Sequence, residues 1–178
     1  MSSTPTSDTS TTPSFETGRP EHWLAFGFGA GLSPVAPGTM GTLVAIPIYL
    51  LLSNLSTAFY VIAVAALIAV GVWACGKVVE DSADQDPPAI VWDEVVGFLV
   101  AMTAVPMGLP WIIMGFLLFR LFDIYKPWPV DWAQERFSGG LGIIADDLAA
   151  GALTWIVLQL MVMMVSASLG HGAAPIAH

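Results

Sequence analysis

The sequence predicts an all-α protein, a multi-pass membrane bundle of about five helices whose polar motifs gather on one face. Hydrophobic residues make up 56% of the 178 residues, and charged residues make up only 11%. In a soluble domain about a quarter of all residues are charged, so this composition indicates a membrane protein. The apolar residues are also grouped into long runs, and the length of the chain suits one domain.

Four apolar runs lie at residues 40–53, 57–75, 95–119 and 148–168. The second and fourth approach the roughly 20 residues that a helix needs to cross a bilayer. The sequence PMGLP at 106–110 interrupts the third run. Because Pro and Gly there indicate a turn, we expect two short helices that form a hairpin. Short helices either extend beyond these bounds or enter only part of the bilayer, and two full-length runs argue against a soluble all-α core.

The two ends of the chain differ from this apolar region. Residues 1–21 are rich in Ser, Thr and Pro, which predicts a disordered polar tail. They lack the basic start and apolar centre of a cleavable signal peptide. Residues 170–178 are expected to form a loose C-terminal tail. The membrane-embedded domain is therefore expected to span residues 22–169.

The charged residues are predicted to lie on one side of the membrane. If each run crosses once, residues 19–39, 76–94 and 120–147 emerge on the same face, and they hold all five Lys and Arg residues. Basic loops stay in the cytoplasm, so this face is expected to be cytoplasmic. The net charge of −9 does not by itself argue against an anionic partner, because the acids are concentrated in a few places. The sequence has no Lys/Arg-rich stripe, which excludes a nucleic-acid partner.

Two pairs of acids are expected at the starts of two of these helices. Asp93 and Glu94 stand in WDEVVG, and Asp146 and Asp147 stand in ADDLAAG, where Gly151 allows close packing of helices. One acid at a helix start could serve as a cap that complements the helix dipole. Two adjacent acids at both places indicate a shared site.

A third motif, FRLFDIYKPWP, brings two cations and an acid together behind an apolar run. Arg120, Asp123 and Lys126 are spaced by three residues, so on a helix they lie along one slowly turning face. The simpler interpretation is that Arg120 and Lys126 snorkel to the membrane surface with Asp123 as a salt-bridge partner.

A fourth motif is GAGLSPVAPGTMGTL. Gly38, Thr39 and Gly41 are expected just before a helix, where backbone N–H groups and a hydroxyl could bind an anion. Pro and Gly are also common just before ordinary helices, which explains the same residues equally well.

Together the motifs suit a divalent cation and a phosphate. Mg2+ prefers carboxylate oxygens and often shares its site with a substrate phosphate, which Arg and Lys would hold. The histidines are expected in the tails, the single Cys75 lacks a phosphate-binding loop, and no Walker loop occurs. Attack on phosphorus by a metal-activated water, or by a carboxylate, remains. A phospholipid headgroup would lie at the depth of this face.

In this order the four motifs resemble the phosphatidylglycerophosphatase A family over residues 23–165. The resemblance implies a Mg2+-dependent membrane phosphatase that converts phosphatidylglycerophosphate to phosphatidylglycerol in the bacterial inner membrane, with its active site facing the cytoplasm. It also implies an acidic site and phosphate-binding cations. The expected metal ligands are Glu94, Asp146 and Asp147, with Asp123 completing the shell or orienting water. The expected catalytic residues are Asp93, Asp123, Arg120 and Lys126. The expected phosphate ligands are Arg120 and Lys126, followed by Gly38, Thr39 and Gly41.

Two other classes of function compete with this one. An ion or proton transporter would need acids within the spans, whereas the expected spans contain none. A non-catalytic membrane scaffold would not need the acid pairs. The number of metal ions, the headgroup selectivity and the oligomeric state are not set by the sequence.

Overall fold

The computed structural model describes residues 16, 18–82 and 87–171, and within these residues the chain is helical without strands. Of the expected tails, residues 1–15, 17 and 172–178 lie outside this part, whereas Pro20 and Glu21 already belong to the first helix. The helical elements are α1 (Pro20–Ala25), η1 (Gly27–Leu32), α2 (Pro37–Leu52), α3 (Thr57–Glu80), α4 (Trp92–Ala101), α5 (Leu109–Tyr125), α6 (Val130–Arg136) and α7 (Gly139–His171).

Five of these elements correspond to the expected helices, but the described part holds eight instead of about five. The hairpin of α4 and α5, broken at the Pro/Gly turn, is confirmed. The short elements α1, η1 and α6 were not expected, because few-residue polar or aromatic helices leave no apolar run in the sequence.

The start of the last long helix was predicted wrongly. α7 begins at Gly139 and not at the acid pair, so Asp146 and Asp147 lie two turns inside it. Residues 139–145, GGLGIIA, carry no strong signal for a helix start. The expectation that no acid lies within a spanning helix is therefore wrong for α7. In the same way α2 begins at Pro37, so Gly38, Thr39 and Gly41 lie in its first turns.

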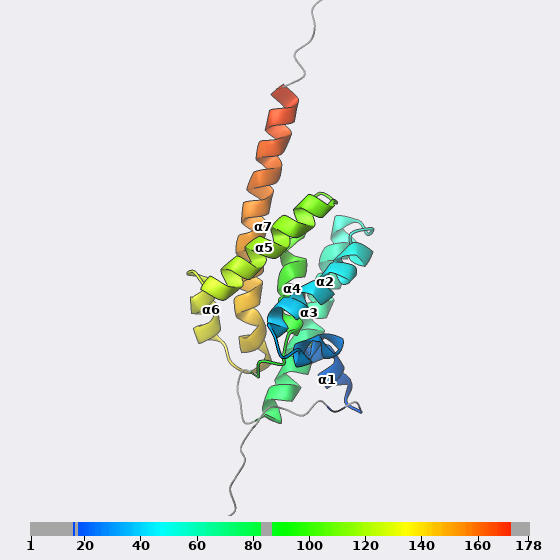
Figure 1. Ribbon diagram of the computed structural model, residues 1–178, viewed down its shortest axis with the longest axis vertical. Helices are drawn as coiled ribbons and strands as arrows, with labels where there is room; N and C mark the ends of the chain where they lie inside the picture. The colour runs from blue at the N-terminus through cyan, green and yellow to red at the C-terminus, as the bar shows by residue number, and fades with distance from the viewer. Residues whose placement is uncertain (1–15, 17, 83–86, 172–178) are drawn as a thin grey trace, which may run out of the picture.

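The short helix α4 is the centre of the molecule. Most of its residues are buried, and α2, α3, α5 and α7 all pack against it (Figure 1). Near the C-terminal end of α4, a backbone carbonyl accepts a hydrogen bond from a side chain of a neighbouring helix: the Tyr60 hydroxyl donates to the Leu99 carbonyl at 2.7 Å. Past the end of α4, the Trp155 indole and the Gln159 amide donate to the Thr103 carbonyl at 2.9 and 3.1 Å. A helix end that has no water around it requires such partners, so α4 can end inside the bundle.

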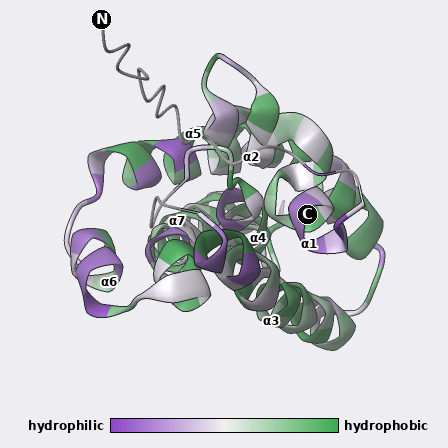
Figure 2. Ribbon diagram, turned by 90° about the horizontal axis from the view of Figure 1, so that it is seen from below, coloured by the Kyte–Doolittle hydropathy of each residue, from purple (hydrophilic) through white to green (hydrophobic). Residues whose placement is uncertain are grey.

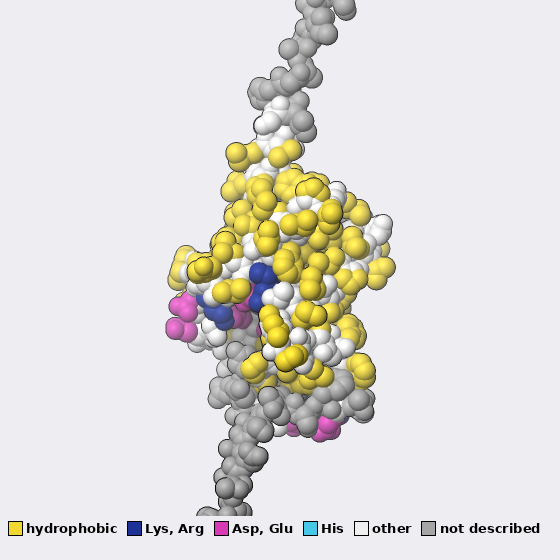
Figure 3. Space-filling model, in the orientation of Figure 1, with side chains coloured by type: hydrophobic (Ala, Val, Ile, Leu, Met, Phe, Trp, Pro, Cys, Tyr) yellow, Lys and Arg dark blue, Asp and Glu magenta, His cyan; other side chains and the backbone are white. Residues whose placement is uncertain are grey.

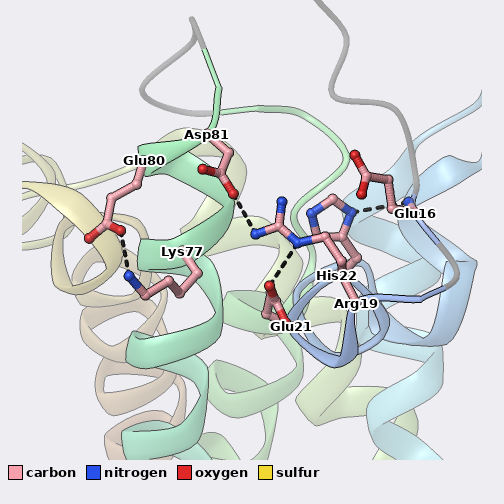
Figure 4. A network of polar contacts seen from close by, with 7 residues as sticks. All are labelled: Glu16, Arg19, Glu21, His22, Lys77, Glu80 and Asp81. Carbon is pink, nitrogen blue, oxygen red and sulfur yellow. Dashed lines mark hydrogen bonds and ion pairs between the residues drawn. The ribbon is translucent and has the colours of Figure 1, made fainter.

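At the opposite end of the bundle α1 is held against the end of α3. Arg19 pairs with Glu21 at 2.8 Å and also with Asp81, which follows α3 (Figure 4). His22, expected in a tail, is instead buried in α1, where its Nδ1 accepts a hydrogen bond from the Glu16 backbone N–H at 3.2 Å. This packing closes the lower side of the bundle.

Two helices are long and apolar enough to cross a membrane, Thr57–Glu80 and Gly139–Ser168. Only 28% and 22% of their most apolar stretches are buried inside the molecule, so most of their apolar surface faces outward. The last turns of α7 extend beyond the other helices (Figure 1). Seen from below, hydrophilic residues gather at α6 and near the adjacent ends of α4 and α7, while α3 is largely hydrophobic (Figure 2). Such a surface fits a lipid environment.

Candidate active site

Two glycines bring α4 and α7 together. The Cβ of a residue larger than glycine at 97 would lie 2.7 Å from the Asp147 carbonyl oxygen, and one at Gly151 would collide with the Gly97 carbonyl. Only glycines permit so close an approach of two helix backbones. Asp93 lies one turn before Gly97, and Asp147 lies one turn before Gly151. The close contact therefore places the acids of α4 beside the acid of α7.

The acids that meet there are Asp93, Glu94 and Asp147, whose ligand oxygens lie within 4.8 Å of one another. Asp147 is buried and the other two are half-buried. In each carboxylate one buried oxygen (Oδ1 of Asp93, Oε2 of Glu94, Oδ2 of Asp147) has no hydrogen-bond partner among the described residues. Buried carboxylates repel one another and lose their hydration, so the arrangement favours a bound cation. An all-oxygen donor set suits a hard divalent ion.

One cation already adjoins this carboxylate cluster. Arg120 Nη1 lies 2.6 Å from Asp123 Oδ2 and 3.6 Å from Glu94 Oε1. Its Nε is buried and has no hydrogen-bond partner in the described part of the chain. Gly38, at the start of α2, lies so close that a Cβ there would collide with Glu94 and come within 3.1 Å of Arg120 Nη1. The first turn of α2 thus forms one wall of the site, next to a guanidinium with unused donors.

The second cation, Lys126, follows the end of α5, six residues after Arg120. α5 ends at Tyr125, and Lys126 follows in the left-handed region with φ 43° before Pro127 stops the helix. Its Nζ donates to Asp146 Oδ2 at 2.8 Å and to Gln134 Oε1, from α6, at 3.0 Å. Partial burial lowers the pKa of Lys126, but the hydrogen bond and charge of Asp146 outweigh it and raise the pKa above its usual value. Lys126 therefore stays positively charged.

These groups line one cavity of about 900 Å³. Both cations and the carboxylate cluster line it, and its side-chain charges come from Asp93, Glu94, Arg120, Asp123, Lys126, Asp146 and Asp147. On the face shown in Figure 3, charged side chains lie together below a broad hydrophobic surface. A polar cavity beneath an apolar belt can receive the headgroup of a lipid whose chains stay in the belt.

The structure thus gathers the seven charged residues that the sequence singled out. The acids that lie together in the carboxylate cluster, however, are not the set that was expected to bind the metal. Asp93 joins the carboxylate cluster, whereas Asp146 faces Lys126, because neighbouring residues on a helix point about 100° apart. Gly38 lines the cavity. Thr39 and Gly41 are not among its lining residues, and Gly41 packs against Val91.

Among the unanticipated cavity residues, Gln134 contacts a predicted site residue. Gln134 lies on α6, which leaves no apolar pattern in the sequence, and its contact with Lys126 depends on the turn between α5 and α6. Its position eight residues after Lys126 gives no signal of contact.

The fold and the cavity define a membrane-associated helical protein with a carboxylate site fit for a metal and cations fit for a phosphate. A family model described as Phosphatidylglycerophosphatase A matches residues 23–162. The chain belongs to this family, and it is a phosphatase, a phosphoric monoester hydrolase of phospholipid metabolism.

Individual relatives agree with the family match. The chain is 42% identical over 136 residues to a protein of Escherichia coli named Phosphatidylglycerophosphatase A, covering 76% of this chain and 79% of that protein. It is 40% identical over 141 residues to the Haemophilus influenzae protein of the same name, covering 78% and 86%. A third relative, from Bacteroides thetaiotaomicron, is 40% identical over 143 residues, covering 76% and 89%, and is provisionally named a phosphatidylinositol-3-phosphatase. No solved structure matches the chain. Nothing in these matches supports the transporter hypothesis.

Proposed function

We propose that the protein removes the terminal phosphate of phosphatidylglycerophosphate with the help of Mg2+, at the cytoplasmic surface of the bacterial inner membrane. The observation that carries this proposal is the cluster of Asp93, Glu94 and Asp147, with unpartnered oxygens, in one cavity with Arg120 and Lys126. The substrate is taken from the name Phosphatidylglycerophosphatase A, which the Escherichia coli and Haemophilus influenzae relatives share with the matching family model.

The carboxylate cluster would hold the metal. Asp93, Glu94 and Asp147 offer three oxygens within 4.8 Å, and Asp146 is engaged by Lys126. With a divalent ion held by these three carboxylates, the site would have positive charge for the phosphoryl oxygens and an activated water for the attack. Mg2+ takes oxygen ligands and keeps positions for waters and substrate phosphate oxygens, which carboxylates beside an open cavity would allow.

Arg120 would bind the phosphate that leaves. Its guanidinium has unused buried donors, and Asp123 fixes its orientation through a 2.6 Å contact. A planar guanidinium can donate two parallel hydrogen bonds to a phosphate. Gly38 lets the first turn of α2 lie against this pair, because a Cβ there would collide with Glu94 and come within 3.1 Å of Arg120 Nη1. Asp123 also lines the cavity, and it would accept a proton from the attacking water.

The apolar helices within residues 22–169 would cross the membrane, and the cavity would lie at their cytoplasmic end. Arg19, Lys77, Arg120, Lys126 and Arg136 all lie towards the end of the bundle that carries the cavity or in the segments next to it. Basic residues are retained on the cytoplasmic side. Phosphatidylglycerophosphate made by cytoplasmic enzymes would reach the site without crossing the membrane.

The role of the cluster is tested by Glu94→Gln, which keeps the shape of the side chain and removes its charge. We expect phosphate release from phosphatidylglycerophosphate to fall by about 100-fold or more, since a neutral amide would bind the divalent ion more weakly than the carboxylate does and the reaction would lose the positive charge of that ion. Asp131→Asn is the matched control, because Asp131 is exposed on α6 and does not line the cavity. Equal activity of both variants would remove the cluster from the mechanism.

A further inference from the structure

We propose that Val91, which precedes α4, and Trp92, its first residue, are positioning residues for the metal site. They anchor the first turn of α4 on its neighbours, and this anchoring holds Asp93 and Glu94 where a divalent ion can bind them together with Asp147. The inference rests on the proposed function, because it takes the carboxylate cluster to be the place where the ion binds. It also gives a role to the glycine-rich segment before α2, whose sequence suggested an anion site.

The side chain of Val91 fills a socket made by three glycines, Gly27 and Gly31 of η1 and Gly41 of α2. Val91 is fully buried. A Cβ at Gly27 would lie 2.8 Å from Val91 Cγ2, and one at Gly41 would lie 2.7 Å from both the Cβ and the carbonyl oxygen of Val91. A Cβ at Gly31 would lie 3.2 Å from Val91 Cγ1 and would collide with the Ala89 carbonyl. An ordinary contact begins at 3.4 Å, so only glycines leave room for this side chain.

Two hydrogen bonds hold the same two residues. The Val91 N–H donates to the carbonyl of Ala25, the last residue of α1, at 2.9 Å. The Trp92 indole N–H donates to the Leu67 carbonyl of α3 at 3.2 Å. Trp92 is buried, and its ring lies against Gly71 of α3, where any Cβ would collide with it. The start of α4 is therefore tied to α1 and α3 as well as to the glycine socket.

The anchored residues adjoin the acids in the sequence, so their placement decides where the acids lie. Asp93 follows Trp92 directly, and both belong with Glu94 to the first turn of α4. A helical turn moves as a unit, because its peptide planes are rigid and hydrogen bonds join it to the next turn. On the other side of the acids, the close contact at Gly97 brings α4 towards Asp147. The geometry of the carboxylate cluster thus depends on one close contact before the acids and one after them.

A divalent ion makes strict demands on this placement. Mg2+ binds oxygen at about 2.0–2.1 Å in near-ideal octahedral geometry, and the distances in a real site lie within about 0.2 Å of such values. In Gly41→Ala the new Cβ starts 2.7 Å from Val91 and must move away by about 0.7 Å to reach an ordinary contact. It meets the backbone of Val91 and not a flexible chain end, so the start of α4 has to shift. A shift of this size exceeds what the ion tolerates.

The test measures binding of Mn2+, which prefers the same oxygen ligands as Mg2+, to the purified full-length protein in detergent without substrate, by electron paramagnetic resonance. The variants are Gly41→Ala, which presses on the Val91 backbone, and Trp92→Phe, which keeps an aromatic ring and removes the indole N–H. Gly76→Ala is the steric control, because its Cβ would meet its nearest neighbour at 3.6 Å. Tyr60→Phe is the stability control, because it removes a buried hydrogen bond near the other end of α4.

We expect Gly41→Ala to weaken Mn2+ binding by about 10-fold or more and Trp92→Phe to weaken it less, since groups that orient metal ligands are worth about 10–100-fold in affinity. Both controls should bind Mn2+ as the wild type does, although Tyr60→Phe unfolds at a lower temperature. The Mg2+ concentration that gives half-maximal phosphate release should rise in the same order as the Mn2+ dissociation constant. A purely structural role would lower the unfolding temperature and leave both of these quantities unchanged.

Mn2+ binding by folded Gly41→Ala and Trp92→Phe that is as tight as binding by Tyr60→Phe would overturn the inference. A wild type that binds no Mn2+ would overturn it as well. If Gly41→Ala does not fold, Trp92→Phe decides the question alone. A wild type that binds Mn2+ but releases no phosphate from phosphatidylglycerophosphate would reject the proposed function, whereas Mn2+ binding by the variants would still decide the role of the anchored turn.

Discussion

The close contact between α4 and α7 can be perturbed by one methyl group, in Gly97→Ala. The new Cβ would lie 2.7 Å from the Asp147 carbonyl oxygen and 2.8 Å from two ring carbons of buried Phe119. An ordinary contact begins at 3.4 Å, so α4 and α7 must separate by about 0.7 Å. Neither a helix carbonyl nor a buried ring can yield as a flexible chain end would.

Overpacking of this kind costs about 1–3 kcal/mol, while replacing glycine inside a helix returns about 0.5–1 kcal/mol. We therefore expect a modest loss of stability, with an unfolding temperature lower by a few degrees. The activity should suffer more, because moving a reacting group by about 1 Å can cost 100-fold in rate. The separation would pull Asp93 and Glu94 away from Asp147.

The assay is phosphate release together with thermal unfolding in the same detergent. Gly76→Ala is the matched control, since it makes the same exchange inside α3 but its Cβ would meet its nearest neighbour at 3.6 Å, an ordinary contact. If Gly97→Ala kept the turnover and stability of Gly76→Ala, the reasoning that the glycine contact sets the geometry of the carboxylate cluster would be refuted.

Three further predictions concern single side chains. Asp147→Ala should lower turnover by orders of magnitude while membrane insertion, measured by fractionation and protease protection, stays intact; near-normal turnover would exclude Asp147 from the site. Tyr60→Phe removes the buried hydrogen bond to the Leu99 carbonyl and should lower the free energy of unfolding by about 1–2 kcal/mol, with little change in the KM; unchanged stability would show that the contact contributes nothing. Asp81→Asn breaks the exposed pair with Arg19 and should leave turnover unchanged with only a small, salt-sensitive loss of stability; a large loss of activity would mean that α1 acts on the cavity.

The long helices could be predicted because their apolar runs are local features of the sequence. The start of α3 at Thr57 matches the expectation, but its end does not, because the helix continues through Gly76 and Lys77 to Glu80. Hydrophobicity ends where the lipid ends, while a helix continues until its backbone is capped. The same difference explains why α7 begins well before the acid pair.

The sequence allowed us to predict which charged residues lie together in the candidate site. It did not allow us to predict which of them contact one another. Acids and cations crowded next to apolar runs are visible in the sequence. The partner of each acid depends on contacts between helices: Asp147 turns towards Asp93 through the glycine contact, whereas its neighbour Asp146 meets Lys126. Gln134 enters the cavity only because the chain turns back after Lys126. No local pattern encodes these contacts.

The proposed mechanism depends on carboxylates that hold a divalent ion which the phosphatase reaction needs. This dependence is measured most directly as phosphate release from phosphatidylglycerophosphate by the purified wild-type protein with Mg2+, after treatment with EDTA, and after Mg2+ is restored. We expect release with Mg2+, none after EDTA, and recovery when the ion returns. Folded protein that releases no phosphate, or releases it equally fast in EDTA, would contradict the proposed mechanism.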